Sequence, residues 1–239
     1  MTNITLPPNI AIVGDVHLRH KIVEDRLSQH DFDQVIFIGD YFDSYDPLST
    51  KATAEWLQES VQKPNRKHLM GNHDIHYYPG CRNEYFCSGY SKSKRDKIQR
   101  KFNLWGDLGL FYKVGDAILT HAGIGNSYVQ RVLDLEIDLE EWLADQTEEF
   151  MASVSDWDGK APHWFLNWGS LRGGWAEQGG ILTMDVREYR TIEGVNQIFG
   201  HTPIFPEPVI ETEYICLDNH SGVGFLTTES GKIEVEVLK

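Results

Sequence analysis

Five short segments of the chain carry aspartate, histidine or asparagine close to a glycine, in a combination that suits metal binding. Carboxylate oxygen, imidazole nitrogen and amide oxygen together favour borderline divalent ions such as manganese, iron or zinc over magnesium or calcium. A carboxylate shared by two such ions holds them ~3.5–4 Å apart and lets them acidify the water between them. The five segments are residues 14–17, 39–43, 71–74, 121–123 and 200–203.

Each of these segments directly follows a run that we predict to be a strand, and the runs before the first, second, fourth and fifth segments are mostly apolar. Ligands of open α/β sheets bind outside the carboxyl ends of the strands, so the five segments are expected to meet at one edge. Helical stretches at residues 21–29 and 50–61 separate the first three runs, and this βαβαβ alternation predicts a parallel sheet. The five predicted strands are residues 9–13, 34–38, 66–70, 117–120 and 197–199.

The remaining pattern predicts one α/β domain over residues 1–239, since this length is too short for two comfortable domains. Residues 133–150 form an acidic amphipathic stretch that predicts a helix. Strand-like runs dominate after residue 196, so we expect a second sheet built mainly from the C-terminal half. These runs are residues 214–217, 224–226 and 232–238, with a hairpin loop joining the last two.

Composition limits the classes of partner. The formal net charge is -14, with 36 acidic against 22 basic side chains, which argues against bulk nucleic acid and against anionic membrane surfaces. Bound cations reverse the potential locally, so a phosphorylated substrate stays compatible with this charge. No apolar run approaches the ~18 residues that span a bilayer, and the N-terminus is unlike a signal peptide, so we expect a cytoplasmic protein. The sequence indicates no oligomeric state.

The chain has three cysteines, Cys81, Cys87 and Cys216, at irregular spacing. An odd number without a repeated pair does not indicate a disulfide framework. A clip between Cys81 and Cys87, or their use in a zinc site, is the alternative interpretation. We expect free thiols.

Taken together, the five segments resemble the calcineurin-like metallophosphoesterases. The family pattern is Asp-x-His, Gly-Asp-x-x-Asp, Gly-Asn-His-Asp/Glu, a single His and Gly-His, and all five occur here in order from Asp15 to His201. The resemblance implies a four-layer αββα sandwich, in which helices flank two mixed β-sheets. It also implies a hydrolase that attacks phosphorus in line with a hydroxide bridging two metals, without a covalent intermediate.

Transferred to this chain, the family pattern implies a pair of divalent metal ions, expected to be manganese, with iron or zinc as alternatives. The resemblance assigns Asp15 and His17 to the first ion and makes Asp40 the bridge. It assigns three further ligands to the second ion, namely Asn72, His121 and His201.

His73 is not a ligand in this resemblance but the general acid that protonates the leaving group, with Asp43 hydrogen-bonded to its other nitrogen. A carboxylate partner fixes the tautomer of the ring and holds the imidazolium ready to donate. Asn72 and His73 are also expected to contact the substrate phosphate, together with Arg172.

Arg172 is chosen because the chain departs from the branch that it resembles most, the phosphoprotein phosphatases and symmetrical dinucleoside tetraphosphatases. That branch has Asp-Arg-Gly where this chain has Asp43, Ser44 and Tyr45, so one phosphate-binding arginine is missing. A guanidinium at residue 172, between glycine-rich neighbours, would bind two phosphoryl oxygens. Arg19 and Arg82 are weaker substitutes.

Two further departures concern single positions. Pro203 stands where many members have a second histidine, which leaves the first ion with three protein ligands. Leu18 stands where the branch has glycine after the first histidine.

The resemblance leaves the substrate open. A phosphoserine or phosphothreonine protein, or another phosphomonoester, is the first candidate, and a nucleotide or dinucleoside polyphosphate is the second. A phosphodiesterase and a non-catalytic scaffold of the same fold are weaker alternatives. Aromatic residues between 77 and 90, and the tryptophans at 157, 164, 168 and 175, are expected to pack within the protein rather than to bind ligand.

Overall fold

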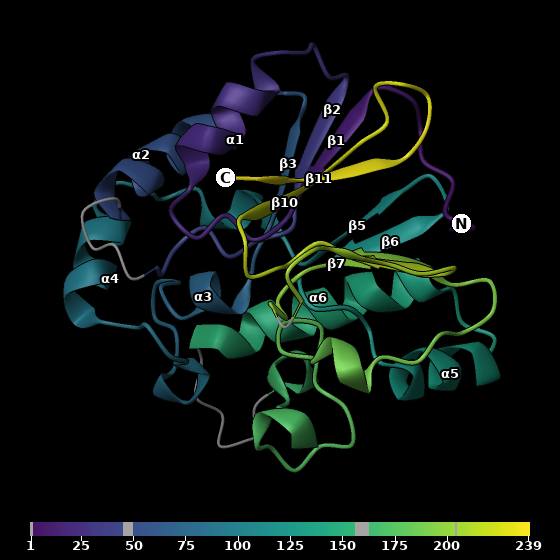
Figure 1. Cartoon of the computed structure of the whole chain (residues 1–239). Coiled ribbons are helices and arrows are strands. Elements are labelled where there is room, and N and C mark those ends of the chain that lie inside the picture. The colour runs from purple at the N-terminus through teal and green to yellow at the C-terminus, as the bar shows by residue number, and fades with distance from the viewer. Residues whose placement is uncertain (1, 45–49, 156–162, 204) are drawn as a thin grey trace.

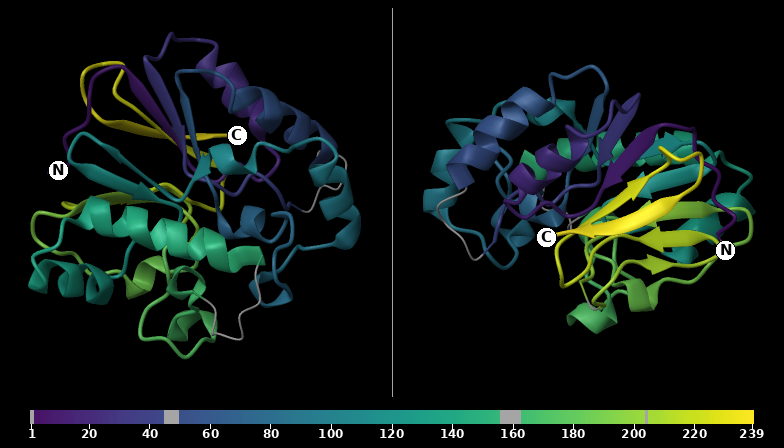
Figure 2. Two further views of the ribbon diagram at one scale, coloured as in Figure 1. Left: turned by 180° about the vertical axis from the view of Figure 1, so that it is seen from behind. Right: turned by 45° about the horizontal axis from the view of Figure 1, so that its top comes forward.

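Two mixed β-sheets lie face to face, and helices cover the outer side of each (Figure 1). The structure, a computed structural model, describes residues 2–44, 50–155, 163–203 and 205–239. Helices α1 and α2 lie outside the first sheet, and α5 and α6 lie outside the second, as both views of Figure 2 also show. This is the four-layer αββα arrangement that the resemblance implies.

The first sheet has six strands in the order β11-β10-β1-β2-β3-β4. Strands β1 to β4 run parallel, while β10 pairs antiparallel with both β1 and β11. The strands are β1 (Ile10–Val13), β2 (Gln34–Phe37), β3 (Arg66–Leu69), β4 (Leu108–Gly109), β10 (Val223–Thr227) and β11 (Glu234–Leu238).

The second sheet has five strands in the order β5-β6-β7-β9-β8. Its three central strands run parallel and its two edge strands antiparallel. The strands are β5 (Phe111–Val114), β6 (Ala117–Thr120), β7 (Asn196–Phe199), β8 (Val209–Ile210) and β9 (Tyr214–Cys216).

Alternating side chains of the short strands build two different cores. Ile10 and Ile12 of β1 point between the sheets, where they join a buried cluster with Leu119 of β6. Ala11 and Val13 point the other way, into the cluster beneath the helices. Because both faces of β1 are covered, its four residues are all apolar instead of alternating with polar residues.

The helices agree with the predictions near the N-terminus and differ farther along the chain. Predicted helices at 21–29 and 50–61 correspond to α1 and α2, and the helical region predicted over 133–150 is present but interrupted. Two helices occupy that region, and Glu136, with φ at 56°, lies in the bend between them. The α-helices are α1 (His20–Leu27), α2 (Thr50–Ser60), α3 (Asn72–Ile75), α4 (Lys92–Gln99), α5 (Asn126–Asp134) and α6 (Leu139–Ser155).

The C-terminal hairpin corrects a second expectation. Strands β10 and β11 are joined as predicted, but they extend the first sheet, where Ala11 of β1 pairs with Thr227 of β10. The second sheet therefore takes its strands from residues 111–216 rather than from the end of the chain. Among the described helices, none combines the length and the apolar character that crossing a membrane requires. The cytoplasmic location stays a prediction.

One buried histidine makes the stability of the fold sensitive to acid. His68 of β3 lies between the Ser60 hydroxyl, 3.0 Å away, and the Tyr41 hydroxyl, 3.1 Å away, and its ring stacks on Phe37. Burial lowers the pKa of His68 from 6.5 to about 3. The folded protein therefore binds this proton only below about pH 3, whereas the unfolded chain binds it from about pH 6.5 downward.

Stability is therefore expected to fall as the pH drops from 6.5 to 3, by at most about 5 kcal/mol from this residue. Urea unfolding at several pH values, with a chelator present throughout, measures this slope. The His68→Gln variant should have a flatter profile, while the half-exposed His30→Gln variant should keep the wild-type slope. An unchanged slope in His68→Gln would assign the acid sensitivity to other groups.

Candidate metal centre

The carboxyl ends of strands from both sheets meet at one edge, and the loops that leave them are joined by backbone hydrogen bonds. The amide of His17, after β1, donates to the carbonyl of Asp40, after β2, at 2.7 Å. The amide of Gly200, after β7, donates to the carbonyl of His121, after β6, also at 2.7 Å. The predicted convergence of the strand ends is therefore present.

Two glycines permit the carboxylates to approach the loops closely. A Cβ atom at Gly71 would lie 2.1 Å from Oδ1 of Asp40, and one at Gly200 would lie 2.1 Å from Oδ1 of Asp15. Any larger residue would displace the carboxylate that lies there. The glycine in the third and fifth segments is thus required for space.

Several polar residues of this edge adopt left-handed backbone conformations that usually favour glycine. Such conformations cost on the order of 1–3 kcal/mol each and persist where the surrounding structure enforces them, often at functional sites. Leu18, which stands where the related branch has glycine, is also left-handed, with φ at 68°. The polar residues are His17 at 41°, Asp40 at 52°, Asp43 at 62° and His201 at 71°.

Four side chains from four loops direct their donor atoms into one small space. Nε2 of His121 lies 3.0 Å from Oδ1 of Asn72, 3.2 Å from Nδ1 of His201 and 3.5 Å from Oδ1 of Asp40. Nδ1 of His121 faces the carbonyl of Ile38 at 3.0 Å, which fixes the ring and leaves Nε2 for the shared space. Asp40, His121 and His201 form a group with the spacing of metal ligands.

A second group of the same kind shares Asp40 with the first. Asp15, His17 and Asp40 bring one donor atom each to within 4.8 Å of one another. Nε2 of His17 lies 3.7 Å from Oδ2 of Asp40, whereas the other oxygen, Oδ1, faces His121. The two oxygens of Asp40 therefore point to two adjoining sites.

The electrostatics of this edge suit cations. Burial lowers the pKa of His17, His121 and His201, so that their rings stay neutral with a lone pair free for coordination. Burial and the nearby carboxylate of Asp218 raise the pKa of Asp15 well above its usual value. Buried carboxylates that repel one another and neutral imidazoles that face one another are both stabilised by a bound cation.

The donor set therefore fits two divalent ions of the manganese, iron or zinc type. All six residues expected as ligands lie in the two groups or against them. Their assignment as ligands stays a prediction, and so does the identity of the metal.

His73 lies beside the two groups and contacts Asp43, as expected for the predicted acid and its partner. Nδ1 of His73 is 3.3 Å from Oδ2 of Asp43, and its ring meets that of His17 edge to face at 5.5 Å. Burial lowers the pKa of His73, but the charge of Asp40 and hydrogen bonds with Asp43 and Cys87 outweigh it and raise the value to about 12. The surroundings of His73 thus favour its protonated form.

The two groups open onto a cavity of about 720 Å³ that contains most of the predicted site. A neighbouring cavity of about 520 Å³ lies on the other side of His17 and His73, and Arg19 and Lys94 line it. The larger cavity is lined in part by His17, Asp40, Asn72, His73, Arg172 and His201.

The three candidate arginines differ in position. Arg172, in the short 3-10 helix Ser170–Arg172, lines the larger cavity and is held by Asp185 at 3.1 Å and by the hydroxyl of Thr202 at 3.3 Å. Arg19 lines the smaller cavity. Arg82 packs over the ring of Tyr85 and lines neither. These positions favour Arg172, whose role as a phosphate ligand stays a prediction.

Asp74, whose positioning role the sequence did not reveal, ties two of the loops together. Its fully buried carboxylate accepts backbone hydrogen bonds from Asp40 and Gly71 at 2.8 Å each and from Tyr41 at 2.9 Å. Asp74, the last residue of the third segment (residues 71–74), therefore positions the loop that carries Asp40. The family pattern, which has Asp or Glu there, is the signal that could have indicated this.

Asp218 is a further buried carboxylate of the cavity that the sequence analysis missed. It follows β9, its Oδ2 is buried without a hydrogen-bond partner among the described residues, and it lines the larger cavity. Burial and the charge of Asp40 raise the pKa of Asp218 to about 7. The strand at 214–217 was predicted, so applying the strand-end rule once more would have found this residue.

Asp43 has more partners than the sequence indicated. Its Oδ1 accepts hydrogen bonds from the Tyr77 hydroxyl at 2.6 Å and from the Lys94 ammonium at 2.7 Å. Its Oδ2 lies 2.8 Å from Nε2 of His76. Although burial opposes it, hydrogen bonds from His73, His76 and Lys94 hold the pKa of Asp43 well below its usual range. Asp43 is thus an anion at neutral pH.

The tryptophans divide between core and cavity. Trp164 stacks on Tyr128 at 4.2 Å and packs against the main core, which confirms the packing prediction there. Trp175 is wrongly predicted, because it is fully exposed, at 103%, and lines the larger cavity together with the half-buried Trp168. Trp157 lies outside the described residues.

Comparisons with known proteins agree with this geometry. A model of the calcineurin-like phosphoesterases matches residues 8–205. A comparison with curated proteins gives no match.

Solved structures with a similar fold include two structures of cold-active protein tyrosine phosphatase. One, from a psychrophilic Shewanella species, is 15% identical, with a TM-score of 0.52 over 98% of this chain and 83% of that chain. The other is 17% identical, with a TM-score of 0.57 over 97% of this chain and 81% of that chain. A protein serine/threonine phosphatase from Saccharomyces cerevisiae is 13% identical, with a TM-score of 0.48 over 96% of this chain and 80% of that chain. At these identities the likeness is one of fold.

Proposed function

The chain belongs to the calcineurin-like phosphoesterase family, and on that premise we propose that it is a phosphomonoesterase with a dinuclear metal centre. Hydrolysis of phosphate esters with the help of metal ions is the activity of the family. The proposal adds the residues that hold the ions, the residue that protonates the leaving group and the class of ester. The proposed ligands are Asp15, His17, Asp40, Asn72, His121 and His201.

The observation that carries the proposal is the sharing of Asp40 between two donor groups. Oδ1 of Asp40 faces His121 at 3.5 Å, and Oδ2 faces His17 at 3.7 Å. One carboxylate that presents an oxygen to each of two sites is the arrangement that a two-metal hydrolase needs. When bound, the ions would supply an acidified water as nucleophile and would neutralise charge on the phosphoryl oxygens.

The chain's own residues orient the ester and provide the proton. His73 holds one proton at Nδ1 against Asp43, which leaves Nε2 to donate to the leaving-group oxygen. Arg172, fixed by Asp185 and Thr202 at the cavity wall, would bind the phosphate, together with Asn72. These roles require the substrate to enter the larger cavity.

Phosphoserine or phosphothreonine in a protein is the first substrate class that we propose. The larger cavity is open to solvent, so a side chain that projects from a protein surface could reach it. Its polar lining residues, which include Asp40, Asn72 and Arg172, suit the phosphate group of such a side chain.

A nucleotide or dinucleoside polyphosphate is the second class, and a specific feature favours it. Trp175 exposes its whole ring at the rim of the larger cavity, where a nucleobase could stack on it. Across His73, the smaller cavity presents Arg19 and Lys94, which are suitably charged for additional phosphates.

Metal analysis followed by a substrate comparison tests the proposed function. Purified protein loaded with manganese should retain about two ions per chain and should hydrolyse an aryl phosphate, as expected of a two-metal site. A phosphopeptide and diadenosine tetraphosphate, compared side by side, then separate the two substrate classes. A protein that retains no metal and has no activity would instead be a scaffold of this fold.

Replacing Trp175 should distinguish the two classes within one assay. If a base stacks on it, Trp175→Ala is expected to lower kcat/KM for diadenosine tetraphosphate about tenfold or more, since stacking is worth ~1–3 kcal/mol. Trp175→Phe should restore most of the loss. Leu171→Ala removes another exposed apolar side chain that does not line the cavity and serves as the control. Equal losses for phosphopeptide and dinucleotide would exclude base stacking.

A further inference from the structure

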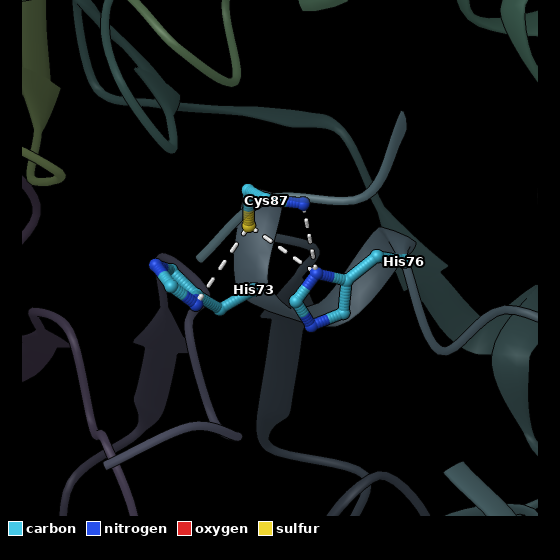
Figure 3. Close-up of side chains that lie close together, drawn as sticks. All are labelled: His73, His76 and Cys87. Carbon is cyan, nitrogen blue, oxygen red and sulfur yellow. Dashed lines mark hydrogen bonds between the residues drawn. The ribbon is translucent and has the colours of Figure 1, made fainter. Parts of the chain in front are cut away.

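Beside the dinuclear centre, two histidines and a cysteine direct their side chains toward one another (Figure 3). Sγ of Cys87 lies 3.2 Å from Nδ1 of His76 and 3.8 Å from Nδ1 of His73. One donor atom from each of the three lies within 4.8 Å of the other two. We call these residues, His73, His76 and Cys87, the thiol cluster.

The fold brings the thiol cluster together from two segments. His73 lies in α3, and His76 caps its C-terminal end, so the two rings stand three residues apart on one side of a single helical turn. Cys87 comes from the loop that follows the 3-10 helix Asn83–Tyr85 and lies across that turn. The backbone amide of Cys87 also points to Nδ1 of His76, at 3.5 Å.

The two sulfur-to-nitrogen distances in the thiol cluster match the edges of a tetrahedral site. A zinc ion with Zn–S of about 2.3 Å and Zn–N of about 2.0–2.1 Å has its sulfur and nitrogen ligands about 3.5 Å apart. The observed separations of 3.2 and 3.8 Å lie on either side of that value. A thiolate with two imidazoles selects zinc or a similarly soft ion over manganese or magnesium.

We propose that the thiol cluster is a separate binding site for a third, sulfur-ligated cation of the zinc class, next to the dinuclear pair. Three protein ligands leave a fourth position for water or substrate. His73 and Cys87 line the larger cavity, so an ion can reach them from solvent.

The surroundings of the thiol cluster support a metal site. Nε2 of the fully buried His76 lies 2.8 Å from Oδ2 of Asp43, which orients the ring with Nδ1 toward Cys87. A carboxylate behind a ligating histidine fixes the tautomer and strengthens coordination. Asp43 is itself held by Tyr77 and Lys94, so this support is rigid.

Occupation of the thiol cluster should inhibit catalysis, and this consequence, unlike the binding itself, rests on the proposed function. A cation at the cluster takes the lone pair of His73 at Nδ1, where the proposed acid carries the proton that it shares with Asp43. His73 can then no longer act as a charged donor. The inhibition should be stronger for alkyl than for aryl phosphates, because aryl leaving groups need less protonation.

Cobalt alone, added to the metal-depleted full-length protein, tests the binding without reference to activity. The proposed dinuclear ligands are all oxygen and nitrogen, so a thiolate-to-cobalt charge-transfer absorption can arise only from a cysteine. We expect this absorption in the wild type and in Cys81→Ser, which changes a half-buried thiol outside the cluster. It should be absent in Cys87→Ser and in Cys87→Ala, two variants whose folding is checked by circular dichroism.

Two spectroscopic outcomes would overturn the proposed third site. One is a wild type that shows no charge-transfer absorption at any cobalt concentration, which would leave the thiol cluster as a set of hydrogen bonds. The other is an absorption that persists in a folded Cys87 variant, which would assign the sulfur ligand to a different cysteine.

Zinc inhibition of the manganese-loaded enzyme provides the functional readout. With an alkyl phosphate as substrate, Cys87→Ser should raise the half-inhibitory zinc concentration at least about tenfold, whereas Cys81→Ser should leave it unchanged. Each variant is measured against its own rate without zinc. An equal zinc response in all three proteins would contradict the site. A protein without phosphatase activity would contradict the proposed function alone, because the cobalt spectrum still decides the third site.

Discussion

Asp40→Asn is expected to reduce kcat/KM for a phosphomonoester at least about a thousandfold, which corresponds to about 4 kcal/mol of lost transition-state stabilisation. The two carboxylate oxygens of Asp40 face different donor groups, with Oδ1 toward His121 and Oδ2 toward His17. An asparagine keeps one oxygen acceptor and presents an NH₂ group to the other site. One of the two ions should therefore be lost or displaced.

Metal content and kinetics together measure this effect. After loading with manganese, Asp40→Asn should contain about one manganese ion or fewer per chain, against about two in the wild type. Asp25→Asn, which makes the same chemical change at an exposed position of α1, should keep both metal and activity. An Asp40→Asn protein with two ions and a wild-type rate would show that Asp40 does not bridge.

His73→Ala is expected to separate metal binding from proton transfer. The side chain of His73 lies outside both donor groups of the proposed dinuclear centre, so the variant should retain those two ions. Loss of a general acid typically costs a factor of about 10²–10⁴ when the leaving group is poor. We therefore expect kcat for an alkyl phosphate to fall by that factor, and kcat for an aryl phosphate to fall much less.

The ratio of the two rates is the decisive measurement for His73. His220→Ala, which removes an exposed histidine, is the control for loss of an imidazole and should leave the ratio unchanged. If His73→Ala slowed aryl and alkyl phosphates by the same factor, the side chain would contribute to binding or charge stabilisation rather than to protonation.

The convergence of the strand ends was the predictable part of this site. Asp40 and His201 lie far apart in sequence, yet each follows a short apolar run by one glycine. Parallel strands of α/β sheets present their carboxyl ends at one edge. The apolar run followed by glycine was therefore enough to predict that Asp40 and His201 lie close together. The family resemblance then suggested a role for each of these residues, and the observed distances in the site are compatible with those roles.

The segment between α3 and α4 could not be predicted, because its position depends on loop packing rather than on periodicity. Cys87 reaches His73 only through the path of an irregular loop, and no local pattern fixes such a path. Helix α4 was missed because its eight residues include a single apolar side chain, Ile98, and so lack an amphipathic stripe. Lys94, which contacts Asp43 from this helix, was missed with it.

The pairing of the C-terminal hairpin escaped prediction for a similar reason. Strand-like runs identified β10 and β11 in the sequence, but such runs do not show which sheet a strand extends. The choice is made by the edge of β1, which the parallel strands leave open on one side.

The pairing of β1 with β10 also determines when the site can mature during synthesis. Strand β1, which delivers Asp15, is translated before β10 and gains its neighbour on one side only after Thr227 has been translated. Until then the backbone groups on that edge of β1 are unpaired and can bind strands of other chains. Such an exposed edge favours aggregation and binding by chaperones. Metal loading is therefore expected to occur only after the hairpin of β10 and β11 has been translated.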